Sequence, residues 1–181
     1  MNVTVFEAIN ITKKYRNTLA LNQVSMSVMQ GDIYGFIGEN GAGKTTMIRL
    51  LTGLAEPTTG KIALFGESNK KLAKQRERIG CIIESPSLYL DMTAYENLEV
   101  QRLQRGIPGK GCIDNALALV GLKDTGKKKA KDFSLGMRQR LALAIALLGN
   151  PEFLVLDEPI NGLDPTGIIE LRNLLKRLNK E

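Results

Sequence analysis

Residues 38–45 read Gly38-Glu39-Asn40-Gly41-Ala42-Gly43-Lys44-Thr45 and complete the pattern G-x-x-x-x-G-K-[ST]. Glycines at these spacings let the backbone curl until several N–H groups converge, which suits the α- and β-phosphates of a nucleotide. Lys44 is placed to reach the β- and γ-phosphates, and the hydroxyl of Thr45 is placed to ligate Mg²⁺. The stretch therefore predicts a nucleoside triphosphate as the ligand.

The residues on both sides of this loop support the prediction. Ile33-Tyr34-Gly35-Phe36-Ile37 is an apolar run typical of a strand, and Met47-Ile48-Arg49-Leu50-Leu51 has the apolar spacing of a helix. We expect strand, loop and helix in that order, so that the helix N-terminus adds its dipole to the phosphate cradle. A chance glycine-rich turn with a surface lysine is the alternative, and it does not account for these flanks.

Composition limits the class of protein. The chain has 181 residues, of which 43% are hydrophobic, and this suits one globular domain with a subdomain. It has no apolar run of roughly 18 residues and no signal-peptide pattern at its start, so we expect a cytoplasmic protein. Two distant cysteines and the absence of histidine disfavour a zinc site or a disulfide framework.

The net charge of +6 is concentrated in the run Lys127-Lys128-Lys129-Ala130-Lys131. We interpret this run as a solvated loop, and a surface that faces a membrane or a partner is the alternative. Aromatic residues do not interleave with the lysines, which disfavours nucleic-acid binding.

Strand and helix patterns alternate along the chain. Such alternation predicts an α/β fold with a parallel sheet that binds ligands beyond the carboxyl ends of its strands. The expected strands are 4–11, 24–28, 61–65, 79–83 and 153–156, and the expected helices are 94–103, 113–120, 134–148 and 166–178.

A second group of polar residues follows the apolar strand 153–156. Asp157 and Glu158 place adjacent carboxylates at the carboxyl edge of the sheet. Because successive side chains of a strand alternate, we assign Asp157 to Mg²⁺ and Glu158 to the orientation or deprotonation of an attacking water. An acidic strand end that caps the next turn is the alternative. Ser134, at the expected start of a helix, is by itself typical of an N-cap.

Two further motifs complete a set of four: Phe133-Ser134-Leu135-Gly136-Met137-Arg138-Gln139-Arg140 and Asn161-Gly162-Leu163-Asp164-Pro165. With these motifs the chain resembles, over nearly all of its length, the nucleotide-binding domain of ATP-binding cassette (ABC) transporters. The stretches Ile83-Glu84-Ser85-Pro86 and Ser134-Leu135-Gly136-Met137 resemble more narrowly the bacterial ATPases of the bacitracin-export and lantibiotic-immunity type.

The resemblance implies specific roles. Glu158 is the catalytic residue, and Thr45, Asp157 and Glu84 hold Mg²⁺, the last two directly or through water. Ser134 and Gly136 of one subunit close on the γ-phosphate held by a second subunit, and Asp164 helps to couple the two sites. ATP is the nucleotide, and it is bound by Tyr15, Gly38, Asn40, Gly41, Ala42, Gly43, Lys44, Thr45 and Thr46. Tyr15 stacks on the adenine in this scheme, and a half-buried tyrosine at a strand end is its alternative.

The resemblance also implies a fold. We expect a P-loop NTPase (RecA-like) parallel-sheet core with an N-terminal antiparallel β subdomain and a helical insertion, all within one ABC ATPase domain spanning residues 1–181. Residues 1–87 contain the β subdomain and the P-loop core, and residues 88–132 form the helical subdomain that docks on a permease. Residues 133–181 contain the signature helix, the Asp-Glu strand and the following helix, and the last strand or strands are missing.

This sequence departs from the family pattern at several positions. Glu84 stands where most members have glutamine, and Leu135 and Met137 stand where the common pattern has glycine and glutamine. The histidine that the family places at the end of the next strand is absent, because the chain stops at Glu181. We therefore expect this chain to bind Mg-ATP but to turn it over slowly.

The leading hypothesis is the ATP-binding and hydrolysing subunit of a transporter that moves a peptide antibiotic or another substrate. It would form a homodimer or pair with another cassette, contact a polytopic membrane permease, bind no nucleic acid and lie at the cytoplasmic face of the cell membrane. A soluble ABC-type ATPase is the second hypothesis, although no heptad repeat and no second P-loop is present. A nucleotide-binding dimerisation module without efficient turnover is the third.

Overall fold

The computed structural model describes residues 3–84 and 87–180, which fall into two compact units. The first contains residues up to Ile79 together with 176–181, and the second contains Gly80–Leu175. The expected subdivision at residues 87 and 132 stays a prediction. Of the stretch 83–86 that carried part of the family resemblance, Ser85 and Pro86 lie outside the described residues.

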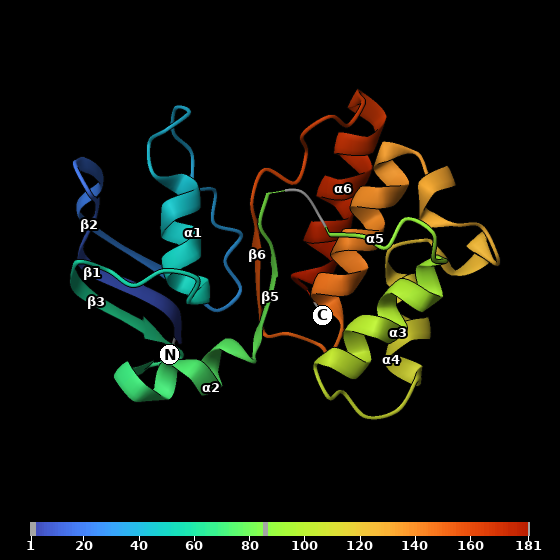
Figure 1. Cartoon of the computed structure of the whole chain (residues 1–181), viewed down its shortest axis with the longest axis horizontal. Coiled ribbons are helices and arrows are strands. Elements are labelled where there is room, and N and C mark those ends of the chain that lie inside the picture. Colours follow the sequence, from blue (N-terminus) through green and yellow to red (C-terminus); the bar gives the residue numbers. More distant parts are fainter. Residues whose placement is uncertain (1–2, 85–86, 181) are drawn as a thin grey trace. The chain divides into compact units, whose positions relative to one another are not determined.

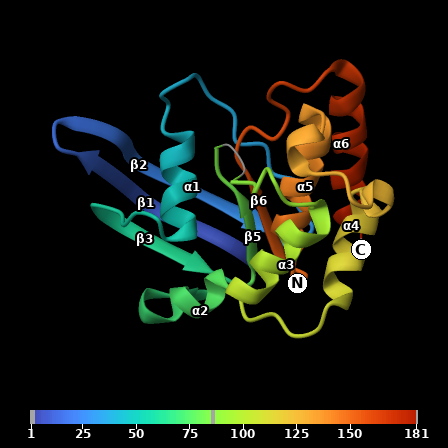
Figure 2. The ribbon, with the colours of Figure 1, turned by 45° about the vertical axis from the view of Figure 1, so that its right-hand side comes forward.

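The first unit is built on an antiparallel sheet with the strand order β2-β1-β3-β4 (Figure 1, Figure 2). Phe6 on the central strand is 1% exposed and pairs with Val28 on one side and Leu64 on the other. Burial of a side chain of this kind contributes about 1.5–3 kcal/mol, so the buried apolar residues of β1 stabilise the sheet. The elements are β1 (Thr4–Tyr15), β2 (Thr18–Met29), α1 (Lys44–Thr52), β3 (Thr59–Leu64), β4 (Glu67–Ser68), η1 (Asn69–Lys71) and α2 (Leu72–Arg76).

The strand expected at residues 33–37 is not formed. Among the described residues, this segment joins no ladder, and all of its side chains are exposed. Ile37 is 93% exposed and Ile33 is 62% exposed. The sequence pattern was that of a strand, but a strand also needs a neighbour whose backbone groups pair with its own. The phosphate loop is therefore preceded by a segment without regular secondary structure rather than by a strand.

The second unit consists of two adjacent strands and a group of helices (Figure 1). Its core is one apolar cluster, to which α5 contributes five fully buried residues, three of them alanines that let neighbouring helices approach. The elements are β5 (Ile79–Ile82), α3 (Ala94–Gln104), α4 (Gly111–Leu119), η2 (Lys123–Thr125), η3 (Ala130–Asp132), α5 (Leu135–Leu147), β6 (Phe153–Leu156) and α6 (Pro165–Leu178). The expected strand 153–156 is confirmed, and the helices begin and end within two residues of their expected limits.

Helix α3 begins with a capping box. The hydroxyl of Thr93 accepts a hydrogen bond from the N–H of Glu96, whose carboxylate accepts from the N–H of Thr93 at 2.8 Å. Asn97, which is 1% exposed, then fastens the preceding loop: its Oδ1 accepts from the N–H of Tyr89, and its Nδ2 donates to the carbonyl oxygens of Tyr89 and Thr93. Because every polar atom of this buried amide is satisfied, the loop is held firmly on the helix.

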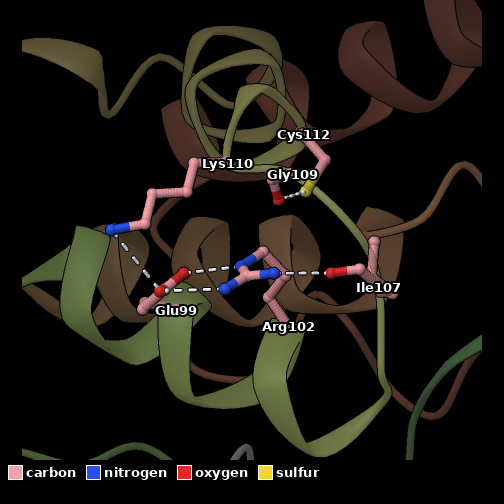
Figure 3. A network of polar contacts seen from close by, with 6 residues as sticks. All are labelled: Glu99, Arg102, Ile107, Gly109, Lys110 and Cys112. Carbon is pink, nitrogen blue, oxygen red and sulfur yellow. Dashed lines mark hydrogen bonds and ion pairs between the residues drawn. The ribbon is translucent and has the colours of Figure 1, made fainter.

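A network of charged groups closes the far end of α3 (Figure 3). The carboxylate of Glu99 accepts from Nε of Arg102 at 2.7 Å and from Nη2 at 3.0 Å, and Nζ of Lys110 lies 3.8 Å away. Nη1 of Arg102 donates to the carbonyl oxygen of Ile107 at 2.6 Å. One arginine therefore ties the helix to the loop that leads into α4.

This network predicts a pH-dependent contribution to stability. The hydrogen bonds from Arg102 hold the pKa of Glu99 below its usual value, with a smaller contribution from the charges of Arg102 and Lys110. A depressed folded-state pKa stabilises the fold above the unfolded pKa, and that stabilisation is lost as the pH falls through the folded value. Glu99→Gln should therefore lower the urea midpoint at pH 7, and the gap from wild type should close at the acidic end of a pH series.

Thr125→Val is the matched control, because it removes a half-buried hydrogen bond to the carbonyl of Leu122 without a titratable group. Its gap from wild type should not change with pH. A Glu99→Gln gap that is equally independent of pH contradicts the prediction.

Candidate functional site

The phosphate loop of the first unit ends where α1 begins. Gly43 occupies the N-cap with a φ of 91°. A Cβ at this position would lie 2.4 Å from the carbonyl oxygen of Ala20 and 2.7 Å from Cδ2 of Leu21. The left-handed backbone and this close approach to β2 both require glycine. The glycine thereby places the free N–H groups of α1 at the end of the loop, where a helix favours an anion.

Lys44 lies across its own loop. Its Nζ donates to the carbonyl oxygens of Gly38 at 2.7 Å and Glu39 at 3.0 Å, and the N–H of Ala42 donates to the same Glu39 oxygen at 3.1 Å. Residues 38–42 are exposed, and Lys44, Thr45 and Thr46 are half-buried on the first turn of α1. The loop is therefore closed around the ammonium group, with its backbone accessible to a ligand.

Tyr15 is the last residue of β1 and belongs to the same unit as the loop. Its side chain is 42% exposed, and Nζ of Lys13 lies 4.7 Å from the centre of its ring. A ring with a cation over one face and an accessible surface is able to stack on a base. The role of Tyr15 in adenine binding stays a prediction.

In the second unit, the expected metal residues follow neighbouring strands. Asp157, which is 7% exposed, directly follows β6, and its N–H donates to the carbonyl oxygen of Ile82 at the end of β5 at 2.9 Å. Glu84 comes two residues after Ile82, is exposed, and has a φ of 59°. Both carboxylates thus follow strand ends at one edge of this sheet, as expected for a ligand edge.

Glu158 is exposed and has a φ of 46°, in the left-handed region that glutamate rarely adopts. The side-chain amide of Asn161 donates to its carboxylate, and the N–H of Asn161 donates to its carbonyl oxygen at 3.1 Å. Neighbours on the same loop therefore hold both the backbone and the carboxylate. Asn161 belongs to a motif quoted from the sequence, but its contact with Glu158 was not predicted.

Ser134 is the N-cap of α5. Its Oγ accepts a hydrogen bond from the N–H of Met137 at 3.2 Å, and its side chain is exposed. Gly136 lies half-buried in the first turn of the same helix. The helix end that would favour an anion is therefore accessible to a ligand from another subunit. The in-trans roles of Ser134 and Gly136 stay predictions.

Asp164 precedes α6 and acts as its cap. Its Oδ1 accepts from the N–H of Gly167 at 3.0 Å, and its carbonyl oxygen accepts from the N–H of Ile168. The residue is exposed, so a capping role within the chain does not conceal it from a partner. Its proposed role in coupling two sites stays a prediction.

The first unit thus carries Tyr15 and the phosphate loop, and the second unit carries Glu84, Ser134, Gly136, Asp157, Glu158 and Asp164. Gln139 was not among the predicted site residues, and its Nε2 donates to the carbonyl oxygen of Pro159 at 2.9 Å. No local pattern predicts this contact, because the two residues lie 20 positions apart in the chain.

Comparison with protein families accounts for this set of motifs. Residues 21–161 match the family model described as ABC transporter. The chain belongs to the ABC transporter family. The predicted resemblance is therefore confirmed.

Two relatives within the ABC transporter family illustrate the likeness. The chain is 50% identical over 179 residues to the bacitracin transport ATP-binding protein BcrA of Bacillus licheniformis, an alignment that covers 98% of this chain and 58% of that protein. It is 42% identical over 172 residues to the lantibiotic transport ATP-binding protein SrtF of Streptococcus pyogenes, covering 95% of this chain and 74% of that protein. The chain thus spans little more than half the length of BcrA.

Solved structures of ABC transporter proteins share the fold. CbiO1 of Clostridium perfringens, part of the CbiONQ complex, superposes with a TM-score of 0.88 at 28% identity, covering 98% of this chain and 74% of that one. A dimeric ATP-binding cassette in a post-hydrolysis state with ADP and phosphate gives a TM-score of 0.81 at 26% identity, covering 97% and 83%. The predicted α/β P-loop NTPase fold is confirmed. No helix within residues 3–84 and 87–180 combines the length and apolar character needed to cross a bilayer.

Proposed function

We propose that this chain is the ATP-binding and ATP-hydrolysing part of an ABC transporter that moves a peptide antibiotic across a membrane. The observation that carries the proposal is the 50% identity to a bacitracin transport ATP-binding protein over 98% of the chain. The same stretch contains an intact phosphate loop and the pair Asp157 and Glu158. A chain that had kept only the fold would have no need for both.

The phosphate loop supplies the binding step. The ammonium group of Lys44 exchanges its contacts with the loop carbonyls for oxygens of the β- and γ-phosphates, and the N-terminus of α1 adds backbone N–H groups. Tyr15 stacks on the base and contributes little to base selectivity, because every base has a π-face. Nucleotide selectivity should therefore be weak beyond the phosphates.

The donors on the chain suit Mg²⁺. Thr45, Asp157 and Glu84 offer only oxygen atoms as ligands. The carboxylate of Asp157 is nearly buried at the edge of the sheet. Mg²⁺ is bound in such sites by one or two protein oxygens, with phosphates and water completing its shell. When bound, the ion would neutralise charge on the phosphates. We therefore include Mg²⁺ as the metal ion in the proposed function.

Hydrolysis needs a group that orients water and accepts its proton, and Glu158 suits this role. Its carboxylate is exposed, and the loop 158–161 restrains its backbone. Ser134 of a second subunit would bring the N-terminus of its α5 to the γ-phosphate, so that two nucleotides are enclosed between two chains. ATP would then stabilise the closed pair, and hydrolysis would remove that stabilisation.

The partners follow from this cycle. We propose a homodimer, or a pair with another cassette, that contacts a polytopic permease through the helical segment 88–132 at the cytoplasmic face of the membrane. The dimeric cassette among the solved structures and the transport relatives support this arrangement. No nucleic-acid partner is proposed.

Binding of a fluorescent ATP analogue tests the nucleotide step. Unlabelled ATP should displace the analogue in the presence of Mg²⁺, GTP should compete within about tenfold of ATP, and AMP should not compete at matched concentrations. Competition by AMP as strong as that by ATP contradicts a site built around the β- and γ-phosphates.

Resistance of cells tests the transport step. Deletion of the gene should increase sensitivity to bacitracin, and a plasmid carrying the wild-type gene should restore resistance. The same plasmid with Glu158→Gln should not restore it. Unchanged sensitivity to bacitracin and to lantibiotics after deletion contradicts the proposed class of substrate.

A further inference from the structure

The helix α5 and the loop that follows Glu158 touch at two places. Nε2 of Gln139 donates to the carbonyl oxygen of Pro159 in a half-buried position. Four residues earlier on the helix, Leu135 covers Gly162, because a Cβ on that glycine would lie 2.6 Å from Cδ2 of Leu135. Residues four apart share one helix face, so a single face of α5 holds both ends of the loop.

The backbone around Glu158 needs such support. A glutamate with a φ of 46° is strained by about 1–3 kcal/mol and keeps this conformation only where its surroundings hold it. The ring of Pro159 fixes the φ of that residue but not its ψ. The direction of the Pro159 carbonyl therefore depends on a hydrogen-bond partner. Gln139 is the side chain that holds this carbonyl.

We propose that Gln139 is a positioning residue for Glu158: its amide fixes the Pro159 carbonyl and so sets the direction of the carboxylate. This inference rests on the proposed function of Glu158 in hydrolysis. Because Ser134 caps the same helix, α5 joins the end that meets the partner's nucleotide to the loop that directs this chain's own carboxylate. The N-terminus of α5 and the loop that follows Glu158 would then move together.

Gln139→Met tests the hydrogen bond, since methionine keeps the length of the side chain but has no N–H donor. The turnover number for ATP should fall about tenfold with the KM for ATP unchanged, because the lost contact acts on the transition state and not on nucleotide binding. Gln139→Glu should lose at least as much, because a carboxylate cannot donate to the carbonyl. A turnover number equal to that of wild type overturns the proposal.

A double-mutant cycle tests the route through Glu158. If Gln139 acts by directing the carboxylate, Gln139→Met should not lower the residual turnover further in a Glu158→Gln background. A fold-loss as large as in the wild-type background shows that Gln139 acts elsewhere and overturns the proposal. A merely structural role would lower both backgrounds alike.

Hydrogen exchange tests the positioning without reference to activity. The N–H groups of Asn161 and Leu163 donate within the loop, to Glu158 and Ile160 respectively, and their exchange should become faster in Gln139→Met. Thr125→Val, which also removes a half-buried bond to a backbone carbonyl, should leave both amides and the turnover number unchanged. Unchanged exchange in Gln139→Met overturns the proposal. If wild-type protein neither binds nor hydrolyses ATP, the proposed function fails, and the exchange result still decides the role of Gln139.

Discussion

Glu158→Gln will lower the turnover number for ATP by about a hundredfold to ten-thousandfold, the usual contribution of a general base. The amide keeps the size of the side chain and is able to accept a hydrogen bond, but it cannot take a proton from water. Binding should persist, because the change removes a negative charge and leaves the phosphate loop intact. The measurement is phosphate release at saturating ATP, together with the dissociation constant for ATP.

The exposed Glu77, in the first unit, provides the matched control. Glu77→Gln makes the same chemical change and should leave both quantities as in wild type. A loss of turnover below about fivefold in Glu158→Gln contradicts the role of general base, which accounts for a larger factor. Loss of ATP binding in Glu158→Gln contradicts the prediction as well.

Lys44→Met will weaken ATP binding by about tenfold to more than a hundredfold, which corresponds to a hydrogen bond to a charged group. Methionine keeps an unbranched side chain of similar length, so α1 retains its first turn while the ammonium group is lost. The effect should be larger for ATP than for ADP, because the lysine is placed to reach the γ-phosphate. Titration of both nucleotides into the same protein measures this difference.

Lys61→Met is the control for charge, since Lys61 is an exposed lysine on β3 in the same unit. It lowers the net charge of the chain by the same amount, so it controls for a general loss of positive charge. If the two variants bind ATP with the same affinity, Lys44 makes no specific contact with the phosphates.

Much of the fold could be predicted from the sequence, because its signals are local. The strand Phe153–Leu156 is a short apolar run bounded by polar residues, and Ser134 stands where a helix cap is expected. The four motifs follow one another in a fixed order, and this order by itself indicates the family. Asp157 directly follows β6 in the structure, as expected.

The remaining features depend on contacts distant in sequence or on backbone angles that the residue type does not reveal. Residues 33–37 have the composition of a strand, but no local pattern supplies a neighbouring strand. Glutamate has no preference for the left-handed region, so the angles of Glu84 and Glu158 could not be predicted. The bond from Gln139 to Pro159 joins residues 20 apart in the chain and becomes visible only after α5 and its loop are packed.

The hydrogen bonds of the Lys44 ammonium group bear on both binding and release of the nucleotide. Nζ of this lysine donates hydrogen bonds to the carbonyl oxygens of Gly38 and Glu39. In the proposed function, phosphate oxygens of ATP would replace these carbonyls, and the gain would be the difference between an anion and two carbonyl dipoles as partners of the ammonium group. After release of the γ-phosphate, the carbonyls would again compete with the nucleotide for the lysine. On this proposal the two carbonyls would offer the lysine hydrogen-bond partners between turnovers and would favour release of the product.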